Sequence, residues 1–188
     1  MSLLELLVEV DDFCQGFETR ISKQQLSGSK RGTQCGLSAS EIMTLVIDFH
    51  REGYRTFKNY YLKHVCQSLR GEFPGLPSYN RFVELMSGVL LPLTAYLQSR
   101  YGECSGISYV DSTAIAVCHN RRIRRHKVFK GLAARGKTSV DWFFGFKLHL
   151  IVNDQGDLLA TFLTPGNTDD RKPLPHMTQV CNLEKATT

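Results

Sequence analysis

The chain has 188 residues, of which 42% are hydrophobic and 22% are charged, values typical of a folded globular protein of one or two domains. No segment approaches the ~18 consecutive apolar residues of a membrane-spanning helix. The N-terminal segment is amphipathic and acidic, unlike the basic start of a signal peptide. We therefore expect a cytoplasmic protein without a membrane partner.

The six cysteines are scattered along the chain, with no Cys-x-x-Cys pair among them. In a cytoplasmic protein this usage predicts reduced thiols rather than a disulfide framework. Cys118 and His119 are adjacent, but no second ligand pair accompanies them, so we expect no zinc site there.

Positive charge is concentrated in one segment. The segment from Cys118 to Lys147 contains nine Lys or Arg residues and one acid, Asp141, so its net charge is +8. The whole chain has a net charge of +5, so the remaining residues carry −3. Because like charges repel unless a polyanion offsets them, this segment predicts binding to nucleic acid. The alternative is an exposed, solvated loop. The candidate DNA contacts are Arg121, Arg122, Arg124, Arg125, Lys127, Lys130, Arg135 and Lys137.

Residues 1–100 have the spacing of helices. Apolar residues recur every three or four positions from Leu3 to Phe17, which predicts a helix. The glycine-rich stretch Gly28–Gly36 predicts a loop. Ser38 and Glu41 form a capping-box pattern that starts a second helix, with Gly53 as its expected stop.

Further helices are expected over 56–69 and from Ser78 across Pro92 to about Ser99, separated by the breaker segment 73–77. Such a bundle could contain a helix-turn-helix in which residues 78–86 read DNA. The alternative is that these helices only pack together, since Arg81 is the one evident DNA ligand in that helix.

After Gly106 the pattern changes to period two. Residues 107–110 predict a strand that ends at Asp111, and alternation over 144–152 predicts another strand. A turn over 153–157 and a third strand over 158–163 complete an antiparallel meander. A helix is expected to begin near Thr168, with two prolines tolerated in its first turn. The predicted fold is α+β, with a helical domain over 1–100 and a mixed domain over 101–188.

Asp111 is the leading catalytic candidate. A carboxylate at a strand end lies where open sheets present ligands, and the basic segment follows it directly. A metal-binding carboxylate beside a phosphate-binding surface suits phosphodiester chemistry. The alternative is an ordinary turn aspartate, which is common after any strand.

The order of these features resembles the DDE transposases of bacterial insertion sequences, in the branch with an RNase H-like catalytic domain. The resemblance covers nearly the whole chain. The segments that carry it are 109–113 (YVDST), 145–150 (GFKLHL) and 163–170 (LTPGNTDD), with 37–42 (LSASEI) and 73–78 (FPGLPS) matching the helical leader.

The resemblance implies that Asp111 is the first of three acids that hold two Mg²⁺ or Mn²⁺ ions for DNA cleavage and strand transfer. The basic residues would then clamp the DNA backbone. Asp169 and Asp170 are weaker candidates for metal ligands. In an RNase H-like fold the second catalytic aspartate follows the helix that these residues precede, so we assign them to the positive helix N-terminus. Lys147 and His149 are expected on a solvated sheet face, and the alternative is that they face DNA.

By the same resemblance, the fourth strand of the fold and the other two acids would lie beyond Thr188. We therefore expect an incomplete RNase H-like domain, catalytically inactive, with no stably bound metal. The expected partners are DNA and further copies of the chain, at the bacterial nucleoid, and no small-molecule substrate is expected. The alternative function is a non-enzymatic DNA-binding remnant or regulator of transposition. An RNase H-like nuclease unrelated to transposition fits the strands but not the helical leader.

Overall fold

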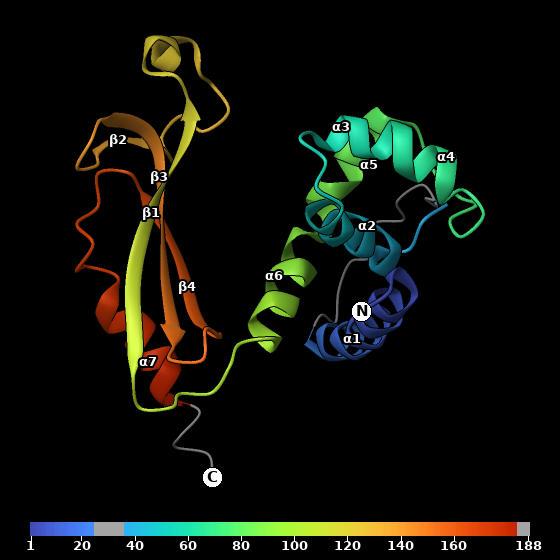
Figure 1. The fold of residues 1–188 in the computed structure, drawn as a ribbon, viewed down its shortest axis with the longest axis horizontal. Coiled ribbons are helices and arrows are strands. Elements are labelled where there is room, and N and C mark those ends of the chain that lie inside the picture. Colours follow the sequence, from blue (N-terminus) through green and yellow to red (C-terminus); the bar gives the residue numbers. More distant parts are fainter. Residues whose placement is uncertain (25–35, 184–188) are drawn as a thin grey trace. The chain divides into compact units, whose positions relative to one another are not determined.

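The computed structural model describes residues 1–24 and 36–183 (Figure 1), so the loop predicted over Gly28–Gly36 lies almost wholly outside the described residues. The chain divides into two compact units, Met1–Ser99 and Arg100–Thr188, and each is treated by itself. Within the described residues, no helix is both long enough and apolar enough to cross a membrane.

The first unit begins with two helices that pack together, α1 (Leu3–Gln24) and α2 (Ala39–Arg51). The predicted capping box starts α2. The Ser38 hydroxyl accepts from the Glu41 amide at 3.1 Å, and the Glu41 carboxylate accepts from the Ser38 amide at 2.6 Å. Gly53, with φ of +68°, follows the end of α2 as predicted, because glycine adopts positive φ without a Cβ clash.

The rest of this unit is also helical, which confirms the prediction for 56–99. A continuous helical run consists of α3 (Phe57–Tyr60), a π-helical segment η1 (Tyr61–Val65) and α4 (Cys66–Ser68). After the proline-containing turn come α5 (Tyr79–Met86), a short 3₁₀ segment η2 (Ser87–Val89) and α6 (Leu90–Ser99). The core of the unit includes Leu6, Val10, Met43, Leu45, Tyr60, Tyr61, Val65, Phe73 and Phe82.

The second unit is an antiparallel sheet with one packed helix, as the α+β prediction required. Its elements are β1 (Ser108–Cys118), the 3₁₀ segment η3 (Asn120–Arg125), β2 (Ala134–Lys137), β3 (Trp142–Asn153), β4 (Leu158–Pro165) and α7 (Leu174–Leu183). The central strand is β3. It pairs with β1 along one edge, while β2 and β4 share its other edge. The expected three-stranded meander is present, and β2 adds a strand within the basic segment.

Helix α7 covers one face of this sheet. Met177 is 1% exposed and packs with Ile151, Leu159 and Ala160, and the His176 ring lies against Phe162. The opposite face carries large apolar side chains that stay exposed, including Ile115 and Leu163. The sheet unit thus presents one covered face and one open face.

Two predicted boundaries were wrong. The strand expected to end at Asp111 continues to Cys118, because the strand formers Thr113, Ile115 and Val117 outweigh the turn tendency of Asp111 and Ser112. The helix expected from Thr168 begins at Leu174, after turns over 166–172. Pro173 and Pro175 do lie at its start, where their missing N–H groups cost little.

Candidate functional site

Asp111 lies within a strand rather than at its end. It is the fourth residue of β1 and pairs with Leu150 of β3. Its side chain is exposed, and Oδ1 accepts from the Ser112 amide at 2.8 Å. The carboxylate therefore has ligand positions open to an ion or to water.

The strand alternation places Asp111 on the open face. Thr113 and Ile115 share that face of β1, and their partners in β3 are Leu148 and Phe146. Ser112 points to the opposite face, which α7 covers. Asp111 is thus a polar group on an otherwise largely apolar face that α7 does not cover.

Lys147 and His149 lie on the covered face, and the prediction that they are solvated was wrong. The His149 side chain is 2% exposed and that of Lys147 is 14% exposed. The Lys147 ammonium donates to Asp170 Oδ1 at 2.9 Å and to the Thr168 carbonyl at 3.1 Å. His149 Nε2 lies 2.8 Å from Thr164 Oγ1. A loop that returns over the sheet buries both side chains.

The electrostatics of this polar cluster follow from its contacts. The hydrogen bond from Lys147 lowers the pKa of Asp170, and a hydrogen bond with the Ser112 side chain lowers it further. Burial lowers the pKa of His149, although Asp170, 4.0 Å from Nδ1, acts in the opposite direction. The cluster consists of a lysine–carboxylate pair beside an imidazole that favours its neutral form.

The structure does not bring Asp169 or Asp170 to Asp111. Asp170 contacts Ser112, whose side chain points away from that of Asp111. Asp169 Oδ1 accepts from the Arg171 amide at 2.9 Å. Neither residue caps α7, which begins four residues after Asp170, so the helix-terminus explanation for these acids was wrong. Over residues 1–24 and 36–183, no group of three potential metal ligands includes Asp111.

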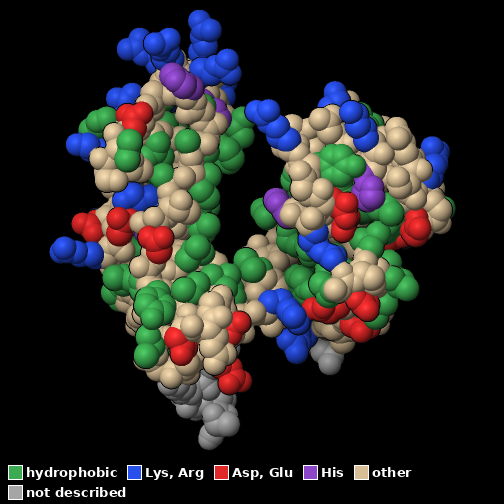
Figure 2. Space-filling model, in the orientation of Figure 1, with side chains coloured by type: hydrophobic (Ala, Val, Ile, Leu, Met, Phe, Trp, Pro, Cys, Tyr) green, Lys and Arg blue, Asp and Glu red, His purple; other side chains and the backbone are tan. Residues whose placement is uncertain are grey.

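The basic segment forms a projection beyond the end of β1. Figure 2 shows Lys and Arg side chains gathered at one end of the sheet unit. His119 caps the 3₁₀ segment η3 by accepting from the Arg121 amide, and the Asn120 side-chain amide donates to the Trp142 carbonyl at 2.6 Å. All eight predicted DNA contacts are exposed, namely Arg121, Arg122, Arg124, Arg125, Lys127, Lys130, Arg135 and Lys137.

Aromatic packing supports this projection, a feature that sequence reasoning missed. Phe129 stacks on His126 and meets Phe146 edge-on, and His126 also contacts Phe144. A cavity of about 300 Å³ lies at its base. The residues lining that cavity are Val117, Cys118, His119, Arg122, Arg125 and His126. The aromatic residues of segment 126–146 were the signal in the sequence from which this packing could have been predicted.

In the helical unit, helix α5 corresponds to the segment 78–86 that was predicted to read DNA. Phe82 is fully buried in the core, while Arg81 is exposed and pairs with Glu84 at 2.8 Å. That pairing gives Arg81 a local structural role. The helix-turn-helix hypothesis stays a prediction.

Comparison with known proteins gives one family match. Residues 101–184 match the family described as "Transposase DDE domain". The matched region runs from just before β1 to the end of α7 and contains Asp111, the basic projection and the Lys147 cluster. No curated protein and no solved structure matches the chain.

Proposed function

We propose, from the match of residues 101–184 to the family described as "Transposase DDE domain", that the protein acts in the transposition of a bacterial insertion sequence. The proposed chemistry is metal-dependent cleavage and transfer of DNA strands. DNA is the proposed partner, gripped through the basic projection, and Asp111 is the proposed first metal ligand. Homo-oligomers that bridge two DNA ends are part of the same proposal.

The observation that carries this proposal is the position of the two features on one strand. Asp111 is exposed on the open face of β1, and the basic projection begins where β1 ends. The strand rises ~3.3 Å per residue, so Cys118 lies about 23 Å beyond Asp111. That span is about two thirds of a turn of B-DNA. A single duplex could therefore contact the projection and, about two thirds of a turn along its axis, place a phosphate beside Asp111.

The chemistry of Asp111 fits one ligand of a hard divalent ion. Its carboxylate is exposed and accepts one hydrogen bond, from a backbone amide. Mg²⁺ or Mn²⁺ prefers such oxygen ligands and, when bound in a two-ion site, supplies charge stabilisation for phosphodiester cleavage. Among the described residues, Asp111 belongs to no group of three potential metal ligands. On that basis, we propose that the 188-residue chain binds DNA but does not cut it alone.

The binding half of the proposal is tested with a fluorescein-labelled duplex and anisotropy at several salt concentrations. Phosphate clamping predicts affinity that falls steeply with salt, because bound counterions are released. Arg122→Glu with Arg125→Glu should weaken binding and flatten the salt slope. The matched control is Lys63→Glu with Arg70→Glu, two exposed cations of the helical unit with the same change in charge. Equal losses in both variants would contradict a role for the projection.

The chemical half is tested by incubating supercoiled plasmid with the chain and Mg²⁺ or Mn²⁺. DNA binding without nicking is the expected result for the wild-type chain. Nicking that disappears in Asp111→Ala would show that the chain supplies a complete site, and would overturn the proposed incompleteness while supporting the role of Asp111. Nicking that persists in that variant would place any activity elsewhere.

A further inference from the structure

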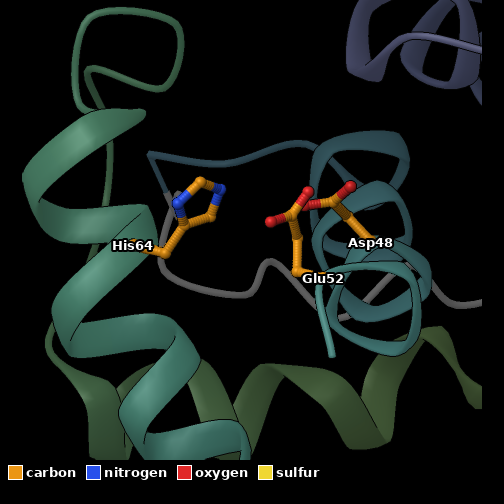
Figure 3. Close-up of side chains that lie close together, drawn as sticks. All are labelled: Asp48, Glu52 and His64. Carbon is orange, nitrogen blue, oxygen red and sulfur yellow. The ribbon is translucent and has the colours of Figure 1, made fainter. Parts of the chain in front are cut away.

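A second cluster of ligand-type side chains lies in the helical unit, away from the DDE domain. Asp48 and Glu52 come from the end of α2, and His64 comes from the π-helical segment η1. One ligand atom of each lies within 4.8 Å of the others. Figure 3 shows the three side chains pointing toward one another. An imidazole and two carboxylates form a donor set typical of divalent transition ions.

The charge on Asp48 is poorly compensated by the protein alone. The residue is 3% exposed. One carboxylate oxygen accepts from the Tyr60 hydroxyl at 2.9 Å, while the other lies 3.9 Å from the Arg51 guanidinium, beyond hydrogen-bond distance. Buried carboxylates are normally paired closely or coordinate a metal. The second oxygen of Asp48 therefore has room for a stronger cationic partner.

The position of both acids on α2 adds to this imbalance. A helix C-terminus carries partial negative charge, and Glu52 is the C-cap residue of α2. Asp48 and Glu52 are also four residues apart, a spacing at which like charges repel on a helix. A cation bound between the two carboxylates would offset both their mutual repulsion and their repulsion by the negative end of the helix.

The imidazole is held at this position by its neighbours. The His64 ring lies 6.0 Å from the Tyr54 ring and 5.7 Å from the Tyr60 ring. The π-helical segment widens the helical run locally, and such segments recur at functional sites. The third ligand is thus supplied by an element other than the helix that carries the two acids.

We propose that Asp48, Glu52 and His64 bind one divalent transition-metal ion, with Zn²⁺ as the best-suited ion. The ion ties the C-terminal end of α2 to η1 and stabilises the helical unit. Exposed Glu52 leaves one side of the site open, so water completes the coordination. This site is separate from the Mg²⁺ or Mn²⁺ chemistry proposed at Asp111, because the imidazole ligand favours zinc over magnesium.

The test is calorimetric titration of the chelator-treated full chain with Zn²⁺ and, in parallel, with Mg²⁺. The expected result is Zn²⁺ binding that Glu52→Gln and His64→Asn each weaken at least about tenfold. His50→Asn, a change in an exposed histidine of the same helix, should leave it unchanged. Because Glu52 is exposed, its variant should fold normally, and circular dichroism verifies this.

A second readout is the melting temperature of the helical unit, followed by circular dichroism. Zn²⁺ should raise it in the wild-type chain and in His50→Asn, and should not raise it in Glu52→Gln. Absence of Zn²⁺ binding overturns the proposal. Binding that is indifferent to both ligand substitutions also overturns it, since the ion would then sit at other residues, such as the cysteines.

Discussion

The Lys147 ammonium lies 2.9 Å from Asp170 Oδ1, so a side chain of the central strand holds the loop that leads from β4 to α7. The same ammonium donates to the Thr168 carbonyl. The segment 163–170, which carries part of the resemblance to DDE transposases, is thereby fixed onto the covered face of the sheet. Its two acids contribute to the fold of this loop rather than lying beside Asp111.

Replacing Lys147 with Met should loosen that loop. The substitution keeps most of the length of the side chain, and it removes the mostly buried ammonium together with its two hydrogen bonds. Because Asp170 is half-exposed and can be solvated, the expected loss of unfolding free energy is modest, about 1 kcal/mol. Urea unfolding followed by the fluorescence of Trp142, the one tryptophan of the chain, reports on this unit. Lys172→Met, at an exposed loop position, is the control and should change stability little.

The pKa of His149 should make the sheet unit less stable in mild acid. Burial lowers this pKa from its ordinary value of 6.5, so the unfolded chain takes up a proton on the imidazole before the folded chain does. The free energy of unfolding of the sheet unit is therefore unaffected by protonation of His149 above pH 6.5, and it declines as the pH falls below that value.

The measurement is the urea midpoint of Trp142 fluorescence from pH 7.5 down to pH 5.5, a range chosen around the ordinary histidine pKa of about 6.5. His149→Gln keeps a polar group near Thr164 and should flatten the decline. His119→Gln, at an exposed position, should leave it intact. A wild-type midpoint that rises toward lower pH would contradict the stated direction.

Local signals in the sequence predicted much of the fold. The Ser38–Glu41 pattern gave the start of α2, because a capping box involves only neighbouring residues. The apolar alternation over 144–152 gave β3, and the polar turn over 153–157 gave its connection to β4. Each of these features is determined by contacts within a few residues.

The errors arose where distant residues decide the outcome. The alternation placed Lys147 and His149 on one face but could not show that Asp170 and its loop return to cover them. Asp111 looked like the end of a strand because the pairing of residues 112–118 with β3 is a nonlocal contact. The approach of His64 to Asp48 and Glu52 likewise depends on how η1 packs, so the spacing of these residues gave no signal.

The capping box of α2 should contribute measurably to the helical unit. Ser38→Ala removes the acceptor for the Glu41 amide and should cost about 1 kcal/mol of unfolding free energy. Thermal unfolding followed by circular dichroism at the helical band measures the loss. Ser99→Ala, which removes a hydroxyl that donates to a carbonyl in the last turn of α6, is a control with a smaller expected effect. Equal losses would mean that the cap contributes nothing beyond an ordinary serine contact.

Gly145 should be the least tolerant glycine of the sheet. A Cβ at this position would lie 1.9 Å from the Ile115 carbonyl oxygen, a backbone atom of β1 that cannot move without breaking the pairing of β1 with β3. Gly145→Ala should therefore destabilise the sheet unit by more than about 3 kcal/mol, or prevent its folding. Gly16→Ala is the opposite control, because nothing lies within 4 Å of its Cβ and alanine is the better helix former. Soluble yield and Trp142 fluorescence measure the first variant, and helical circular dichroism measures the second. A normally folded Gly145→Ala protein would show that β1 can separate from β3 at little cost, and that the pairing of Asp111 with Leu150 is not rigidly fixed.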